Sequence, residues 1–314
     1  MLQAHKVKTA TLWAWIFSGI SAPLAHAAGR SNWLPVLITG VVCGVACYTV
    51  LLVAEKRDYR AGWFGAVQTL WIAVVSGVVA RWSAQCWPTA DGFPMVGVTL
   101  LVLAVFAAWD GAERASRCAG VLFWLLAFLY AVILAAGTQN LKIQYMTPMA
   151  QPSCPMIAML ILVPAVTVFF PCEKRAKILP IGAIVLFGTV VSLWTVGTLS
   201  PKVAAHLADP YYAFTRSLSL FGVAERFESL ASVALTMGYF SLLALLLSSA
   251  YHLTDSALPG KGKTGIIAAA GIAAVIFVFA EKVPQWLLPV VSALLWVLLP
   301  VFLMRKSKKV EKWD

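Results

Sequence analysis

Ten apolar stretches, separated by short polar loops, occupy most of this 314-residue sequence. Each stretch is close to the roughly 20 residues that an α-helix needs to cross the hydrocarbon core of a bilayer. Hydrophobic residues make up 61% of the chain and charged residues only 12%, a balance that excludes an ordinary soluble globular domain. The pattern predicts an all-α membrane protein with about ten transmembrane helices, folded as a single polytopic domain over residues 1–314.

The apolar stretches end at charged or proline-rich junctions, which set the boundaries of the expected spans. These cover residues 9–28, 32–54, 62–85, 95–110, 118–138, 153–171, 177–199, 224–251, 264–281 and 284–304. The longest loop, near residues 200–225, is too short to form a domain of its own. We therefore expect it to lie against the bundle.

The positive charges alternate along the loops. Seventeen Lys and Arg residues lie at one set of junctions and seven at the other. Cytoplasmic loops carry the excess of Lys and Arg, so both termini are expected in the cytoplasm. The net charge of +11 sits at span ends, where it contacts anionic headgroups of the lipid bilayer. No nucleic-acid partner is expected.

The first span has a second interpretation. Lys6 and Lys8 precede an apolar run, and Ala25-His26-Ala27 resembles the cleavage site of a secretory signal peptide. Cleavage would leave nine spans and an external amino terminus. The even number of spans satisfies the charge alternation, which favours a retained first span.

Two expected spans contain helix-breaking residues. The first carries Ser18, Gly19, Ser21 and Pro23. Several prolines lie at residues 148–164, just before and within the sixth span. Broken helices in many transporters expose peptide groups near the membrane midplane, where they bind a substrate or cation. A five-plus-five inverted repeat would make these two spans the broken pair. The alternative for the first span is a proline-kinked helix packed through small residues.

Neutral polar residues on three spans could form a ligand pocket with the first. The candidate ligand-binding residues are Ser18, Gly19, Ser21, Pro23, Ser76, Thr236 and Tyr239. Each of them could instead join neighbouring helices by hydrogen bonds. No Asp, Glu, Lys or Arg lies near the middle of an expected span, which disfavours a proton antiporter. A uniporter, a carrier with sodium bound to backbone carbonyls and a receptor all remain open.

Sequence signals for catalysis or bound metal are weak. Cys43 and Cys47 lie one helical turn apart, but no pair of histidines accompanies them, so all six cysteines are expected to be small buried residues. No H-E-x-x-H or G-x-S-x-G motif occurs. We expect no enzymatic activity, no cofactor and no metal site. The sequence does not identify a coupling cation.

Several segments resemble the spore germination permeases, the membrane-embedded subunits of germinant receptors in the amino acid/polyamine/organocation superfamily. They are AGRSNWLPVL at residues 28–37, DGAER at 110–114, PYYAFTRSLSL at 210–220 and AERFESL at 224–230. The resemblance implies a LeuT-like bundle with a pocket between spans 1, 3, 6 and 8. It implies an amino-acid-like ligand, other receptor subunits as partners, and the cytoplasmic or spore inner membrane of a bacterium. The alternative function is a secondary transporter of amino acids or organic cations.

Three charged residues lie near the expected outer mouth of that bundle. Glu225 is placed to stabilise a helix amino terminus, and Arg226 to cap an outer loop. Arg216 follows Tyr211, Tyr212 and Phe214, a pattern that predicts a short interfacial helix over the mouth. These residues have a structural role in one interpretation and act as a gate in the other.

Overall fold

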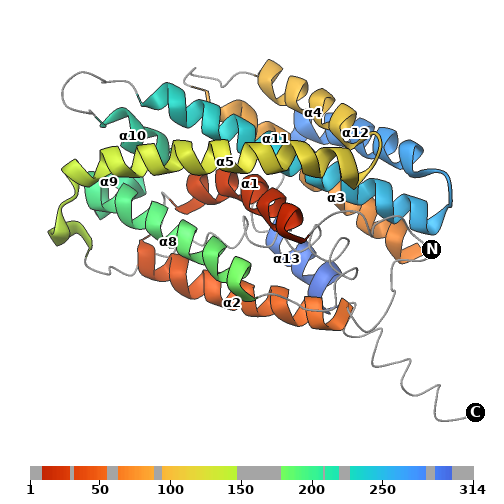
Figure 1. Ribbon diagram of the computed structural model, residues 1–314, viewed down its shortest axis with the longest axis horizontal. Helices are drawn as coiled ribbons and strands as arrows, with labels where there is room; N and C mark the ends of the chain where they lie inside the picture. Colours follow the sequence, from red (N-terminus) through yellow and green to blue (C-terminus); the bar gives the residue numbers. More distant parts are fainter. Residues whose placement is uncertain are drawn as a thin grey trace, which may run out of the picture.

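The computed structural model describes residues 9–28, 32–54, 63–87, 94–146, 178–207, 209–218, 227–280 and 287–298. All regular secondary structure in these ranges is helical (Figure 1). The longer helices are α1 Thr9–Ala28, α2 Trp33–Ala54, α3 Trp63–Gln85, α4 Pro94–Ala108, α5 Ala112–Gly137, α8 Ile178–Leu199, α11 Glu228–Ala257 and α12 Gly262–Phe279. The shorter ones are the 3-10 helices Thr138–Asn140 and Ile143–Met146, α9 Pro201–His206, α10 Pro210–Arg216, α13 Leu287–Ala293 and a π-helical turn at Leu294–Leu298.

Nine expected spans coincide with described helices to within six residues at either end. The sixth, residues 153–171, lies outside the described residues, so the total of ten stays a prediction. Within the described ranges, five helices are long and apolar enough to cross a membrane by length and composition. Three shorter apolar helices accompany them. The chain is therefore a multi-pass membrane protein.

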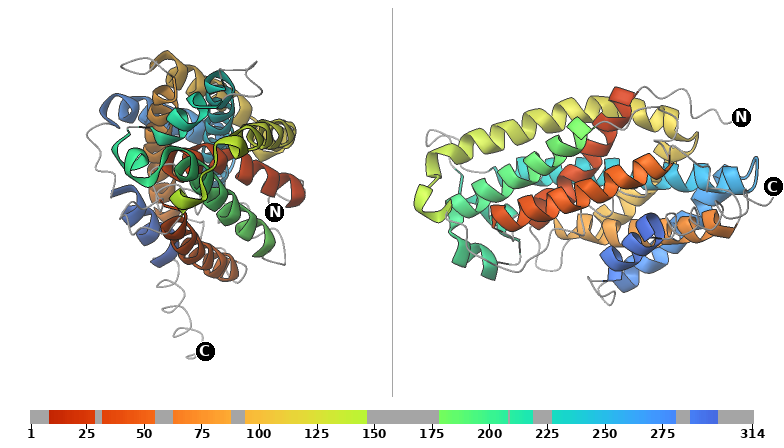
Figure 2. Two further views of the ribbon diagram at one scale, coloured as in Figure 1. Left: turned by 90° about the vertical axis from the view of Figure 1, so that its left-hand side faces the viewer. Right: turned by 90° about the horizontal axis from the view of Figure 1, so that it is seen from below.

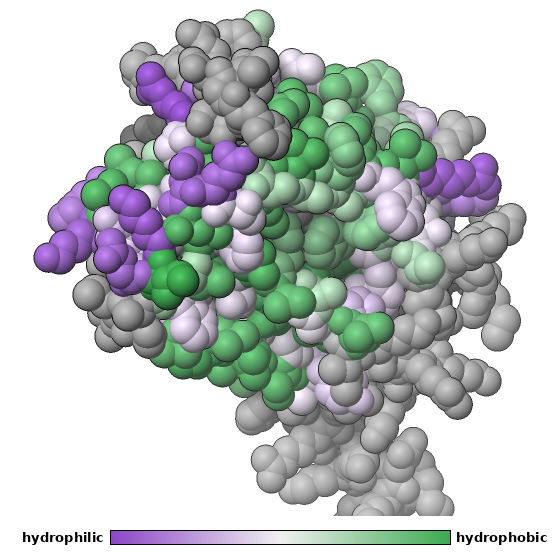
Figure 3. Space-filling view, turned by 60° about the vertical axis from the view of Figure 1, so that its left-hand side comes forward, coloured by the Kyte–Doolittle hydropathy of each residue, from purple (hydrophilic) through white to green (hydrophobic). Residues whose placement is uncertain are grey.

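The outer surface of the bundle is apolar, as contact with lipid requires. Large hydrophobic side chains such as Phe106, Trp124 and Val278 are each more than 70% exposed. Figure 3 shows one face on which hydrophobic residues predominate and hydrophilic residues gather toward the edges. An exposed apolar surface of this extent is stable in lipid but not in water.

Helix α11 is the centre of the bundle and packs against α1, α3, α4, α5 and α12 (Figures 1 and 2). Helix α1 lies between α11, α5 and α8, and its Trp15 and Ile16 are fully buried. The indole Nε1 of Trp15 donates a hydrogen bond to the Ser241 carbonyl of α11 at 3.1 Å. The first helix is thus part of the core of the bundle.

Polar contacts separate the helix ends into two groups, as the charge alternation predicts. At one end, His26 lies beside Asp209, and Ser232 donates to the Cys86 carbonyl at 3.3 Å. At the opposite end, the Ala112 amide donates to His252 Nε2 at 3.4 Å. The ends of α1 and α3 thus lie with the start of α11, and the start of α5 lies with the end of α11, as spans of alternating direction require.

The expected break in the first span is wrong. Every residue of α1 is α-helical, including Pro23. The reason is tight packing on α11: a Cβ added to Gly19 would lie 3.0 Å from Leu242 Cα, and one added to Gly238 would lie 2.7 Å from Ala22 Cβ. Small residues allow this close approach, and the neighbouring helix holds the proline-bearing segment in helical form. Its expected partner, the sixth span, cannot be compared because it is outside the described residues.

Candidate functional site

Helices α1, α3 and α11 come together as the sequence predicts, but most of the candidate hydroxyls are already hydrogen-bonded. Ser18, Ser21 and Ser76 are fully buried, and Thr236 is partly buried. Each donates to a backbone carbonyl about one turn earlier in its own helix, at 2.7 or 2.8 Å. These bonds use the single proton of each hydroxyl, so none of the four can donate to a ligand in this conformation.

The two other α1 candidates have a packing role in this conformation. Gly19 lies against the backbone of Leu242, which leaves no space for a ligand at that point. Pro23 has no amide hydrogen, so the Gly19 carbonyl lacks its usual donor within the helix. The predicted pocket at the middle of α1 is therefore closed here.

Tyr239 differs from the other candidates, because its hydroxyl is buried without a hydrogen-bond partner among the described residues. The hydroxyls of Tyr130 on α5 and Tyr211 on α10 share this property. These three residues, which we call the tyrosine cluster, are at most 3% exposed. A buried polar group left unsatisfied costs about 1–3 kcal/mol. Three such groups in one region indicate a place that is built to receive a polar partner.

The three tyrosines of the cluster lie on elements that pack together. Helix α11 contacts both α5 and α10, which carry Tyr130 and Tyr211. Burial, followed by the nearby Tyr130 and Asp209, raises the pKa of Tyr211 well above its usual value. The Tyr211 phenol therefore stays protonated at neutral pH and can act as a hydrogen-bond donor. The sequence alone did not indicate Tyr130 or Tyr211, because they lie on separate elements with no shared motif.

A cavity of about 680 Å³ opens between α1, α5 and α8. Six of its lining residues are aromatic, the others described are small or aliphatic apart from Thr11, and none is charged. The aromatic residues are Trp13, Phe17, Phe123, Trp124, Tyr130 and Phe187. We call this space the aromatic cavity. Its volume lies in the range of about 300–1,000 Å³ that is usual for small-molecule sites.

Several aromatic rings that line the aromatic cavity pack against one another. Phe17 makes edge-to-face contacts with Phe123 and Phe187 at centroid distances of 5.5 and 5.2 Å, and Tyr130 contacts Phe187 at 4.9 Å. This geometry is the favourable one for aromatic pairs and fixes the shape of the wall. Tyr130 contributes its ring to the aromatic cavity and belongs to the tyrosine cluster as well.

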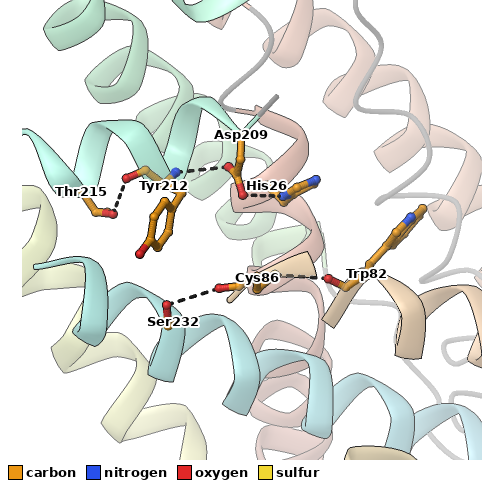
Figure 4. A network of polar contacts seen from close by, with 7 residues as sticks. All are labelled: His26, Trp82, Cys86, Asp209, Tyr212, Thr215 and Ser232. Atoms are coloured by element: carbon orange, nitrogen blue, oxygen red, sulfur yellow. Dashed lines mark hydrogen bonds and ion pairs between the residues drawn. The ribbon is translucent and has the colours of Figure 1, made fainter. Parts of the chain in front are cut away.

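A polar network closes the opposite end of α1 (Figure 4). Asp209 caps helix α10 by accepting a hydrogen bond from the Tyr212 amide at 3.1 Å, and its second oxygen lies 3.2 Å from His26 Nδ1. Below it, the Cys86 thiol donates to the Trp82 carbonyl at 3.4 Å. The bond from Ser232 to the Cys86 carbonyl joins the end of α3 to the start of α11. Thus α10, which carries Tyr211 of the tyrosine cluster, is attached to α1.

Helix α10 forms where the sequence predicts a short helix, and one of its faces packs into the bundle. Tyr211 and Phe214 are fully buried. At its far end, Arg216 lies 3.8 Å from Glu228 of α11, although the arginine is 77% exposed. The two other charged candidates, Glu225 and Arg226, lie outside the described residues. The charged partner of Arg216 is thus Glu228, which the sequence argument did not select.

Comparison with known proteins is informative about the fold. No protein-family model and no curated protein matches the sequence. Among solved structures, the fold is similar to that of Mhp1, a nucleobase-cation-symport-1 family transporter, in a closed conformation with bromovinylhydantoin bound. The TM-score is 0.54 at 14% identity, over 91% of this chain and 74% of that chain. The chain has a LeuT-type transporter fold. At this identity the likeness concerns the fold alone.

Proposed function

We propose that the protein is a secondary transporter whose ligand is a small ring-bearing molecule held in the aromatic cavity. The observation that carries the proposal is an uncharged, aromatic cavity of 680 Å³ between three helices of a transporter fold. Aromatic walls favour a planar ring, because offset and edge-to-face ring contacts add to the gain from burying apolar surface. That the structural neighbour holds a ring compound, bromovinylhydantoin, is in keeping with this choice.

Organic cations and aromatic amino acids are compatible with the same cavity. An ammonium group over an aromatic face gains about 0.5–2 kcal/mol. By contrast, none of the described lining residues can pair with a carboxylate through a positive charge. We place the protein in a bacterial inner membrane with both termini in the cytoplasm, as the excess of Lys and Arg at one set of junctions suggests.

Transport is tested with the full chain reconstituted in proteoliposomes. We expect uptake of at least one labelled probe from a panel of an aryl-substituted hydantoin, an aromatic amino acid and an organic cation. Ala127→Phe adds a ring inside the aromatic cavity and should abolish that uptake. The matched control is Ala274→Phe, which places the same ring at an exposed position of α12. Equal uptake by both variants would mean that the aromatic cavity is not the ligand site.

A second candidate function is nutrient sensing as a germinant-receptor subunit. Its support is the sequence likeness in residues 28–37, 110–114, 210–220 and 224–230. The closed contact of α1 with α11 is also suited to a protein that binds a ligand without moving it. Such a sensor, when purified, would bind an amino acid, yet proteoliposomes that contain it would not accumulate that amino acid. Accumulation of the amino acid driven by an ion gradient would instead support the transporter.

A further inference from the structure

The phenol hydroxyls of the tyrosine cluster are buried polar groups with no structural role among the described residues. Tyr130, Tyr211 and Tyr239 come from three separate elements, α5, α10 and α11, and all three hydroxyls are unpaired within the described residues. A phenol can be replaced by a phenyl ring of the same shape at no loss of apolar contact. Three unpaired phenols in one place therefore indicate a binding role for the hydroxyl groups themselves.

The surroundings of the tyrosine cluster are polar but poor in charge. The Tyr130 hydroxyl lies near that of Ser21, although no hydrogen bond of ordinary geometry joins them, and Tyr239 lies near the Cys86 thiol in the same way. The charged group whose field reaches both Tyr211 and Tyr239 is Asp209. That carboxylate already has His26 and the Tyr212 amide as partners.

These surroundings select an uncharged ligand group. An anion would be repelled by Asp209, and a cation would have to displace His26 from it. Either ion would also lose its hydration among groups that carry no compensating charge. An amide or alcohol, in contrast, can accept hydrogen bonds from the phenols and donate to their oxygens. Uncharged hydrogen-bonding groups are therefore the chemistry that this cluster recognises.

Tyr130 connects the tyrosine cluster with the aromatic cavity. Its ring lines the aromatic cavity, while its hydroxyl lies on the side of Ser21 on α1. We propose that the tyrosine cluster is the polar half of the ligand site, and that it takes an uncharged amide- or alcohol-type group of the molecule whose ring occupies the aromatic cavity. This inference rests on the proposed function and narrows its ligand to uncharged ring compounds.

The preference for an uncharged group is tested with three probes that share a phenyl ring and are similar in size: benzamide, benzoate and benzylammonium. Their binding to the full chain in nanodiscs is measured by equilibrium dialysis. We expect benzamide to bind at least 10-fold more tightly than either ion. If benzoate or benzylammonium binds as well as benzamide, the polar half is not selective for uncharged groups and the inference is wrong.

Removal of single tyrosine hydroxyls tests whether the uncharged group binds at the tyrosine cluster. Tyr130→Phe, Tyr211→Phe and Tyr239→Phe each keep the ring and should weaken benzamide binding by about 3- to 10-fold, the effect of one hydrogen bond to an uncharged partner. The control is Tyr212→Phe, whose hydroxyl lies outside the cluster on the same helix and should leave the affinity unchanged. Unchanged affinity in all three cluster variants would overturn the inference.

The two proposals fail in different ways. If none of the three probes binds, or if Ala127→Phe has no effect on binding, the ring site in the aromatic cavity is wrong, and the inference falls with it. If Ala127→Phe blocks binding but the tyrosine variants do not weaken it, the aromatic cavity stands and the polar half is wrong.

Discussion

The imidazole Nδ1 of His26, near the end of α1, lies 3.2 Å from the Asp209 carboxylate that caps helix α10. Both side chains are largely buried, at 16% and 22% exposure. The same carboxylate binds the Tyr212 amide, so one side chain both starts α10 and joins it to α1. Since α10 carries Tyr211 of the tyrosine cluster, this contact holds one residue of the proposed ligand site in place.

We predict that the position of α10 depends on the contact between His26 and Asp209. Asp209→Ala removes both this contact and the cap on α10, and the loss of an N-cap alone costs about 0.5–2 kcal/mol. Amides of residues 211–218 should therefore exchange hydrogen faster in Asp209→Ala than in the wild type. The measurement is hydrogen exchange by mass spectrometry on the protein in nanodiscs.

His26→Gln removes the contact with α1 but leaves the cap on α10, so it should raise exchange less than Asp209→Ala does. His206→Gln changes a nearby exposed histidine on α9 and should behave as the wild type. Exchange in Asp209→Ala that equals that of the wild type would show that Asp209 does not hold α10 in place.

A second prediction concerns the contact between α1 and α11. Gly19→Ala places a Cβ 3.0 Å from the Leu242 backbone, which cannot move without shifting α11. Overpacking of this kind costs about 1–3 kcal/mol. Gly271→Ala on α12 meets no atom within 4 Å and should instead stabilise by about 0.5–1 kcal/mol, because alanine is the better helix former. Thermal unfolding in one detergent compares the two variants. Equal effects would contradict the close contact.

This contact also explains where the sequence argument failed. Ser18, Gly19 and Pro23 together form the pattern of a broken helix. Small residues serve equally well to bring two helices close together, and only the position of Leu242 decides between the two uses. With α1 packed in this way, Gly19→Leu should lower stability.

The fold was more predictable than the site. Apolar length and charge at the junctions located nine helices, because each depends on its own stretch of sequence. The ligand site depends on residues brought together from distant elements. Tyr239 was selected from its own helix, whereas Tyr130 and Tyr211 acquire meaning only when α5, α10 and α11 are in place. The six aromatic residues of the aromatic cavity could not be selected from sequence either, because a single ring on an apolar helix cannot be distinguished there from a lipid anchor.

The orientation of the chain gives a third prediction. Lys261, between α11 and α12, and Lys202 on α9 are both exposed and belong to opposite ends of the bundle. In a cysteine-free background, Lys261→Cys should react with a membrane-impermeant maleimide only from the cytoplasmic side. Lys202→Cys should react only from the outer side. The reverse result would place the termini outside and contradict the charge rule for this chain.

The last prediction uses the perturbed phenol of Tyr211. Burial raises its pKa well above that of an exposed tyrosine, which is about 10. A pKa that is higher in the folded state means that the folded protein binds this proton more tightly than the unfolded one. The contribution of Tyr211 is thus complete below about pH 10, and it is lost progressively as the pH rises above that value.

Tyr211→Phe removes this proton while keeping the ring. Its melting temperature should therefore fall less steeply than that of the wild type above about pH 10, and the two curves should run parallel at lower pH. Differential scanning fluorimetry in a single detergent across this range makes the comparison. Tyr48→Phe on α2 is the control, because it removes a phenol without affecting the tyrosine cluster. Parallel curves for wild type and Tyr211→Phe up to the most alkaline pH would mean that Tyr211 ionises as readily in the folded protein as in the unfolded chain, and that its phenol is therefore not buried.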